Sequence, residues 1–112
     1  MQLDLRRLIV FTADVDKLGA FYRDVIGLKI AGQETGWIDF AAGACNLALH
    51  AGKPAPGKWP PKLVFYAADV SAARAQLVKR GADMGPVKSA KTFDMCDGRD
   101  PDGNPFQISS RK

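Results

Sequence analysis

The sequence has little of the residue types that mark metal centres, disulfide frameworks and membrane spans. Its 112 residues include one histidine, His50, and two cysteines, Cys45 and Cys96, without C-x-x-C spacing. This cysteine usage favours a reducing compartment, and we expect both cysteines to be small buried residues. No apolar run approaches the roughly 20 residues of a membrane span, and no basic and then apolar leader opens the chain. We therefore expect a cytoplasmic protein without a membrane segment.

The charge pattern also excludes a class of partner. The net charge is +4, but the basic residues are scattered along the chain rather than gathered in one run. Nucleic-acid-binding domains usually cluster their lysines and arginines on one face or segment. With 46% hydrophobic and 25% charged residues, the composition is that of a single globular domain. We expect no nucleic-acid partner.

Hydrophobic periodicity predicts a strand, a helix and three short strands in the first half. Residues 5–12 carry a β-branched and aromatic run typical of a strand. Asp14 is a good helix N-cap, apolar residues follow at helical spacing, and Gly27 stands where the helix should end. Glycines then separate the predicted strands 28–30, 37–40 and 46–50.

The second half repeats this pattern after a proline-rich segment. Residues 52–61 contain four prolines and two glycines and predict a linker between unit one (1–51) and unit two (62–112). Residues 62–70 parallel residues 7–15, Asp69 caps a second helix that stops at Gly81, and strands are predicted at 84–87, 92–96 and 105–109. The segment Asp100-Pro101-Asp102-Gly103-Asn104 predicts a hairpin turn before the last strand.

Three motifs occur in the order and spacing of a known superfamily. They are Ala20-Phe21-Tyr22-Arg23-Asp24-Val25-Ile26-Gly27-Leu28, Ala68-Asp69-Val70 with Arg80-Gly81-Ala82, and the turn at 100–104. In these motifs the sequence resembles the vicinal oxygen chelate superfamily, which includes glyoxalase I, bleomycin-resistance proteins and extradiol dioxygenases. The resemblance implies an α+β fold in which two tandem βαβββ units pair into a cup-shaped mixed sheet with helices outside. It also implies a homodimer, since such units pair within or between chains.

Metal-using members of this superfamily place His or Glu on the cup-facing side of the first and fourth strands of each unit. Carried over through the matching motifs, these positions are Arg7, Ala48, Lys62 and Gln107. Two cations, a methyl group and a weak neutral amide oxygen do not suit a divalent ion. The resemblance therefore comes without its usual metal, and we predict no cofactor and favour a binding protein over an enzyme.

Strand alternation predicts the lining of a small-molecule site. Residues on alternate positions of a strand share a face, and an apolar or aromatic lining with a few polar groups is typical of ligand pockets. Arg7 and Lys62 occupy equivalent places in the two units, so they favour an anionic ligand if they point into the cup, and otherwise reach solvent at its rim. The predicted lining is Arg7, Ile9, Phe11, Trp37, Asp39, Ala48, His50, Lys62, Val64, Tyr66 and Gln107.

Two catalytic alternatives stay open at this point. A divalent metal near His50, with Asp39 as a possible ligand across the sheet, would make the chain a metal-dependent lyase, isomerase or dioxygenase. General acid-base chemistry by Tyr66, Asp39 or His50 is the other alternative.

Overall fold

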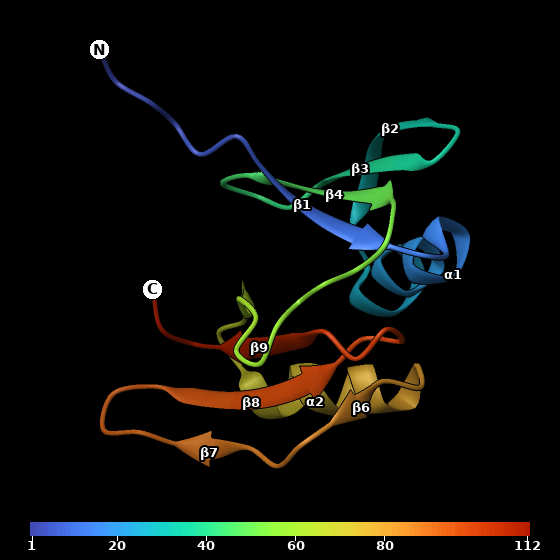
Figure 1. The fold of residues 1–112 in the computed structure, drawn as a ribbon. Coiled ribbons are helices and arrows are strands. Elements are labelled where there is room, and N and C mark those ends of the chain that lie inside the picture. Colours follow the sequence, from blue (N-terminus) through green and yellow to red (C-terminus); the bar gives the residue numbers. More distant parts are fainter. The chain divides into compact units, whose positions relative to one another are not determined.

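The computed structural model describes residues 1–112 and divides them into two compact units, residues 1–55 and 56–112 (Figure 1). The boundary between them lies inside the segment 52–61 that the sequence marks as a linker. No helix is both long and apolar enough to span a membrane.

Unit 1 is a four-stranded sheet with one helical segment against it. The elements are β1 (Arg7–Thr12), α1 (Val15–Ala20), the π-helix η1 (Phe21–Ile26), β2 (Lys29–Glu34), β3 (Trp37–Ala41) and β4 (Asn46–Ala51). The strand order is β1-β4-β3-β2, in which β1 runs parallel to β4 and the other neighbours are antiparallel. The last strand of the unit, β4, thus lies beside its first strand, β1.

Local signals in the sequence set the ends of this helical segment. The Asp14 carboxylate accepts a hydrogen bond from the Lys17 amide, and Gly27 ends the segment with a φ of 90°, which only glycine adopts at no steric cost. The sequence predicted one continuous helix, whereas its second half has the wider π geometry. Leu18 and Tyr22 of this segment are fully buried.

The core of unit 1 lies between this helix and one face of the sheet. The residues Ile38, Phe40, Leu47 and Leu49 are buried on the sheet side, and the rings of Tyr22 and Phe40 lie 6.4 Å apart. Because side chains alternate along a strand, the intervening residues of β3 and β4 point to the opposite face.

Unit 2 repeats the architecture around a second sheet. Its elements are β5 (Leu63–Tyr66), α2 (Val70–Lys79), β6 (Asp83–Met84), β7 (Lys88–Ser89), β8 (Asp94–Arg99) and β9 (Pro105–Ser109). The strand order is β5-β9-β8-β6, with β7 also paired to β8 and with β5 parallel to β9. The predicted α+β class is therefore confirmed, and unit 1 has the predicted element order, whereas unit 2 has four strands after its helix instead of three.

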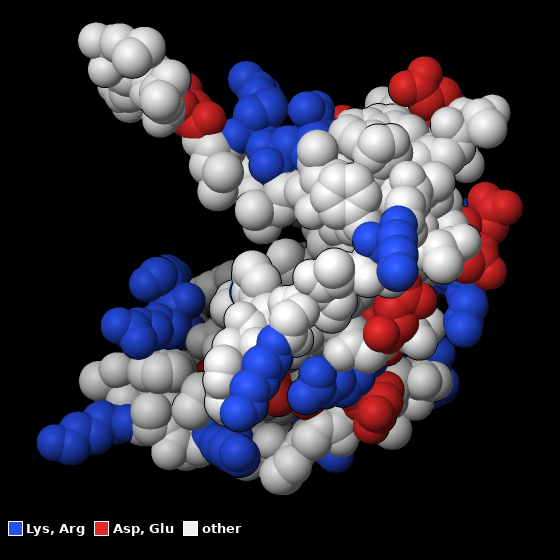
Figure 2. Space-filling view, viewed as in Figure 1, with Lys and Arg blue, Asp and Glu red and all other residues white.

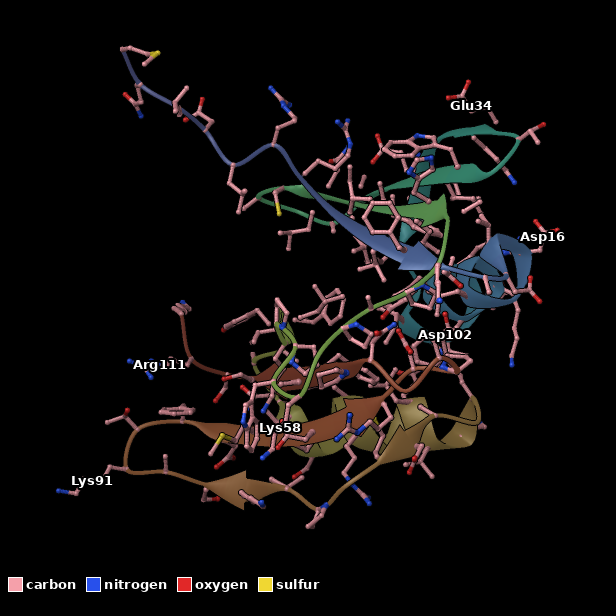
Figure 3. All side chains as sticks on the ribbon, in the orientation of Figure 1. Asp16, Glu34, Lys58, Lys91, Asp102 and Arg111 are labelled. Atoms are coloured by element: carbon pink, nitrogen blue, oxygen red, sulfur yellow. The ribbon has the colours of Figure 1, made fainter.

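Two predicted strands of unit 2 are wrong in their bounds. Of the strand predicted at 84–87 only Met84 is in a strand, since β6 ends there and β7 begins at Lys88; Pro86, between them, has no N–H to give to a ladder. The strand predicted at 92–96 begins at Asp94 and runs on to Arg99, since residues 90–93 form the tip of the β7–β8 hairpin, where Lys91 lies (Figure 3). Gly98 lies inside β8.

The turn before β9 forms as predicted. The Asp100 carboxylate accepts hydrogen bonds from the backbone amides of Asp102 and Asn104 at 3.0 and 2.9 Å, and Gly103 takes a φ of 83°. This turn places β9 antiparallel to β8, with Gln107 opposite Asp97.

Gly98 allows two large side chains to meet over β8, which yields a stability prediction. A Cβ at this position would lie 2.6 Å from both Met84 Sδ and Phe106 Cζ. We expect Gly98→Ala to lower the free energy of unfolding by about 1 to 3 kcal/mol, as overpacking does in other cores. The measurement is urea unfolding followed by circular dichroism.

The matched control is Gly32→Ala in β2. A Cβ there meets nothing within 4 Å and φ is not left-handed, so this variant should be as stable as the parent or slightly more stable. Equal losses in the two variants would contradict the packing argument.

Candidate functional site

The candidate site begins with the sheet faces that the helices leave uncovered. In unit 1, Arg7 of β1 stands opposite Asn46 of β4, Ile9 opposite Ala48, and Phe11 opposite His50. In the next strand pair, Trp37 stands opposite His50 and Asp39 opposite Ala48. We call this surface the first face; it carries Arg7, Ile9, Phe11, Trp37, Asp39, Asn46, Ala48 and His50.

A polar cluster lies at one end of the first face. Arg7 donates to Asp39 through both Nε and Nη2, at 3.2 Å to Oδ1 and 3.1 Å to Oδ2. Asn46 Nδ2 donates to the same Oδ2 at 3.2 Å. The Asp39 side chain is 13% exposed and that of Arg7 is 33% exposed, so this ion pair is much less solvated than a surface pair.

An aromatic cluster adjoins these polar groups. The ring of His50 lies 5.6 Å from that of Trp37 in an edge-on arrangement and 5.5 Å from that of Phe11. The Arg7 guanidinium carbon lies 5.8 Å from the Trp37 ring centre, within the range of a cation–π contact. Phe11 is nonetheless 49% exposed and Ile9 is 47% exposed, so the cluster presents apolar surface to solvent.

Unit 2 carries a related arrangement, which we call the second face. Lys62 Nζ lies 3.0 Å from Asp97 Oδ1, and Gln107 Nε2 donates to the same oxygen at 3.1 Å. On the neighbouring edge strand, Val64 pairs with Gln107 and Tyr66 pairs with Ser109. The second face carries Lys62, Val64, Tyr66, Met95, Asp97 and Gln107.

The two polar clusters occupy equivalent places in the two units. Asp39 stands opposite Ala48 in β4, and Asp97 stands opposite Gln107 in β9. The Asp39 carboxylate accepts hydrogen bonds from Arg7, the first residue of β1, and from the side-chain amide of Asn46. The Asp97 carboxylate accepts them from Lys62, which directly precedes β5, and from the side-chain amide of Gln107. A cation, a carboxylate and an amide therefore recur in both repeats.

The hydrogen-bond donors around each carboxylate lower its pKa. The hydrogen bond from Arg7, and then that from Asn46, hold the pKa of Asp39 below its ordinary value, against burial that acts to raise it. The pKa of Asp97 is lowered mainly by the hydrogen bond from Lys62 and then by that from Gln107. Both groups are therefore carboxylates at neutral pH.

These ion pairs correct the charge argument made from the sequence. The sequence predicted that Arg7 and Lys62 either favour an anionic ligand inside the cup or reach solvent at its rim. The structure instead gives each of them a carboxylate partner, Asp39 and Asp97. Asp97 was not predicted because the strand was expected to end at Cys96, and Asn46 was not predicted because amides carry no charge signal. Because side chains alternate along a strand and Cys96 is buried, a strand that continued past Cys96 would have placed Asp97 on the second face.

The residues present do not fit a divalent metal. None of Arg7, Ala48, Lys62 and Gln107 is a competent ligand, and the chain contains no group of three or more His, Cys, Asp or Glu side chains that could hold a metal ion. Asp39, the possible second ligand beside His50, has both oxygens committed to Arg7 and Asn46. The ring of His50 lies between two other rings instead.

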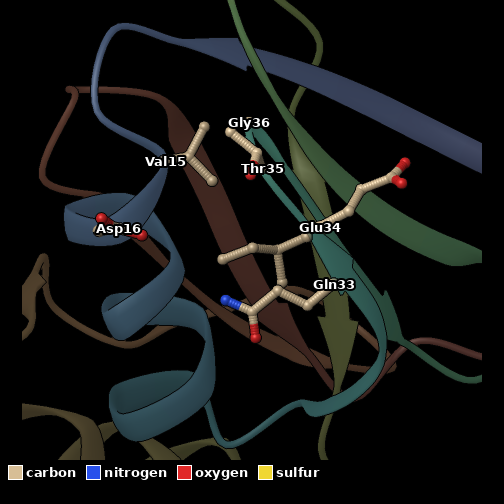
Figure 4. Close-up of a pocket in the computed structure, with 7 residues that line it drawn as sticks. Val15, Asp16, Gln33, Glu34, Thr35 and Gly36 are labelled. Atoms are coloured by element: carbon tan, nitrogen blue, oxygen red, sulfur yellow. The ribbon is translucent and has the colours of Figure 1, made fainter.

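A cavity of about 340 Å³ lies elsewhere in unit 1 (Figure 4). Val15 at the start of α1, Gln33 and Thr35 at the β2–β3 hairpin, and Ile38 line it. Ile38 is buried toward the helix, so this cavity is on the opposite side of the sheet from Trp37 and Asp39. It contains none of the residues predicted for the site.

The two cysteines differ from each other. Cys96 is buried as predicted, and burial raises the pKa of its thiol, which makes it a poor nucleophile. Cys45 is only half-buried, so the prediction that both would be buried is wrong.

Comparison with known protein families supplies the family of the chain. A family model described as a glyoxalase-like domain matches residues 7–109. The chain belongs to the glyoxalase-like domain family. The resemblance to the vicinal oxygen chelate superfamily seen in the sequence motifs is thereby confirmed. No curated protein matches this glyoxalase-like domain in sequence.

Solved structures share its fold over nearly the whole length. An antibiotic-binding protein from a Streptomyces species has 23% identity and a TM-score of 0.79, over 96% of this chain and 94% of that chain. A lactoylglutathione lyase from Agrobacterium tumefaciens has 21% identity and a TM-score of 0.79, over 97% and 94%. A glyoxalase/bleomycin resistance protein/dioxygenase from Nocardioides has 18% identity and a TM-score of 0.77, over 97% and 83%. At these identities the likeness shows the fold.

The Asp39 carboxylate yields a pH-dependent stability prediction. Its pKa is lowered in the folded chain, so its contribution to stability is complete above the ordinary value of about 3.9 and disappears as the pH falls through the folded pKa. We expect Asp39→Asn to lower the free energy of unfolding at pH 7 by about 1 to 3 kcal/mol, the range for a hydrogen bond to a charged group. The loss should shrink steadily as the pH falls below about 4.

Asp24→Asn is the control for this measurement. Its carboxylate pairs with Arg23 on the exposed side of the helical segment, where both side chains are more than half exposed. Such surface pairs contribute little. Urea unfolding of both variants across the pH range tests the prediction, and a pH-independent loss for Asp39→Asn would refute it.

Proposed function

We propose that this glyoxalase-like domain binds a small organic molecule containing an aromatic ring, on the first face, and that it does so without a metal. The observation that carries the proposal is the cluster of Phe11, His50 and Trp37 with the Arg7 guanidinium beside it. The proposal is supported by the similar fold of the antibiotic-binding protein from Streptomyces.

The first face combines the two features that recognise aromatic molecules. Exposed apolar surface at Ile9 and Phe11 is available to cover a ring, and offset or edge-on ring contacts add about 0.5 to 1.5 kcal/mol each beyond the buried area. The polar cluster of Arg7, Asp39 and Asn46 lies within the same strands and offers both donors and acceptors. A ring with one or two polar substituents therefore suits the face.

The ion pair argues for a ligand without a strong net charge. An anionic ligand at Arg7 must compete with a carboxylate that already receives two hydrogen bonds from the guanidinium. Arg7 and Asp39 together are neutral, so a simple anion gains little attraction from this face. We therefore place uncharged aromatic molecules ahead of small carboxylates and phosphates.

A metal-dependent lyase, isomerase or dioxygenase activity is the less favoured alternative. Those reactions need about three protein ligands around an open coordination position. The first face offers only His50, whose ring is held between two others, and Asp39, whose oxygens accept from Arg7 and Asn46. The donor chemistry supports binding rather than metal-assisted turnover.

Fluorescence of Trp37 provides a direct test of the proposal. The chain has two tryptophans, and Trp59 is 87% exposed in the proline-rich segment 52–61, so Trp59→Phe leaves Trp37 as the only reporter. We expect 1-naphthol and other neutral fused-ring probes to change its emission with saturation, and inorganic phosphate to leave it unchanged. Phe11→Ala should weaken binding about three- to tenfold through the lost ring contact.

Phe93→Ala serves as the matched control, because Phe93 contacts Arg111 in unit 2 and takes no part in the first face. Affinity for 1-naphthol should be unchanged in this variant. The proposal fails if no neutral aromatic probe binds, if Phe11→Ala binds as tightly as the parent, or if binding requires an added divalent metal.

A further inference from the structure

Ala48 lies on the open first face and is nevertheless fully buried. It stands opposite Ile9 of β1 and opposite Asp39 of β3, so its methyl group points to the side that the helical segment leaves uncovered. Ile9 beside it is 47% exposed, whereas Ala48 is 0% exposed. Other side chains of the first face therefore cover this position.

The register of the strands identifies the Arg7–Asp39 ion pair as part of that cover. Arg7 stands opposite Asn46, which lies two residues before Ala48 in β4. Because β4 lies between β1 and β3, the guanidinium must cross β4 between Asn46 and Ala48 to donate to both oxygens of Asp39. In Figure 2, basic side chains and uncharged surface adjoin each other over the start of β1.

This crossing requires a small side chain at position 48. Ala48 contributes one methyl group, and Asn46 on the other side of the crossing donates to Asp39 instead of obstructing it. A β-branched side chain at position 48 would fill the space through which the guanidinium passes. Overfilled sites respond by displacing neighbouring side chains, and here the displaced group would be Arg7.

We propose that Ala48 determines the ligand specificity of the first face, because its small side chain lets Arg7 reach Asp39 and the neutral pair that results selects uncharged aromatic ligands over anionic ones. Ala48 acts through Arg7 and is therefore a positioning residue. The inference about specificity rests on the proposed function, whereas the effect of Ala48 on the ion pair stands on the geometry alone.

The selection follows from the groups that the pair engages. Arg7 gives its Nε–H and one Nη2 hydrogen to Asp39, whose charge balances that of the guanidinium. A ligand carboxylate placed at Arg7 would meet the Asp39 carboxylate as well, and repulsion of this kind lowers the affinity for the wrong ligand. A neutral ring meets no such repulsion. An arginine released from Asp39 would instead be available to pair with an anionic ligand.

Ala48→Val tests the inference in the full chain, with 1-naphthol and 1-naphthoate as probes. Both probes contain the same fused rings, and at pH 7 the first is neutral and the second is a carboxylate. Trp37 emission in the Trp59→Phe background reports the binding of each. We expect the parent to bind 1-naphthol more tightly. Ala48→Val should shift the ratio of the two dissociation constants roughly tenfold toward 1-naphthoate, through the hydrogen bond that the released arginine can give to its carboxylate.

An NMR titration of Asp39 measures the ion pair without any ligand. The hydrogen bond from Arg7 lowers the pKa of Asp39 in the parent, so this pKa should rise toward its ordinary value in Ala48→Val. Ala48→Gly leaves the crossing open and should keep the pKa of Asp39 low. Ala48→Ser adds one heavy atom and should raise the pKa by less, which keeps the measurement available if Ala48→Val does not fold.

A double-mutant cycle shows whether Ala48 acts through the ion pair. Asp39→Asn leaves Arg7 without its counter-charge and should itself shift the ratio toward 1-naphthoate. Adding Ala48→Val to Asp39→Asn should then change the ratio little further, because the two substitutions remove the same interaction. Ala51→Val is the matched control, since Ala51 is exposed on the same strand and points to the opposite side of the sheet. It should keep the parent ratio and the parent pKa of Asp39.

The outcomes separate this inference from the proposed function. If neither probe binds the parent, the proposed function and the specificity fail together, and the Asp39 titration still decides whether Ala48 holds the ion pair in place. If the probes bind, the inference is overturned by an unchanged ratio in Ala48→Val or by an unchanged pKa of Asp39 in that variant. It is also overturned if Ala48→Val shifts the ratio as much in the Asp39→Asn background as in the parent.

Discussion

Burial of one face of each sheet beneath a helix is the constraint on which the other features of this protein depend. In unit 1 the helical segment covers Ile38 and Phe40, so the alternation of β3 forces Trp37 and Asp39 to the open side. The same relation in unit 2 buries Cys96 and exposes Asp97. The groups available for recognition are therefore determined by packing on the far side of the strand, and a shift of one residue in register would bury them.

The recurrence of a cation, a carboxylate and an amide in both units has a simple electrostatic meaning. A guanidinium or ammonium on a partly covered sheet face is costly unless a counter-charge accompanies it. Asp39 on β3 and Asp97 on β8 supply that charge. One strand separates β3 from the edge strand β1, and one strand separates β8 from the edge strand β5. The pair in unit 1 is the better shielded of the two, since the Asp39 side chain is 13% exposed and that of Asp97 is 45% exposed. The polar cluster of unit 1 is accordingly the better suited of the two to selective binding.

The sequence predicted the repeat, the helix ends and the β8–β9 turn because each is encoded within a few neighbouring residues. Asp14, Gly27 and the segment 100–104 act through their own backbone, so reading them requires no knowledge of the rest of the fold. The role of Gly98 is not encoded locally, because it depends on Met84 and Phe106, which are distant in sequence. The ion pairs were missed for the same reason, since Arg7 and Asp39 meet only after β4 has come between them.

The parallel pairing of the first and last strands has a consequence for the order of assembly. β3 and β4, like β8 and β9, are joined by short turns and can associate through local contacts. β1 and β5 reach their partners only by closing the loop of an entire unit, which carries a larger entropic cost. Each edge strand is therefore expected to be the last part of its unit to become fixed and the first to be released. In native-state hydrogen exchange, the amides of β1 should open before those of the hairpin to which it is attached.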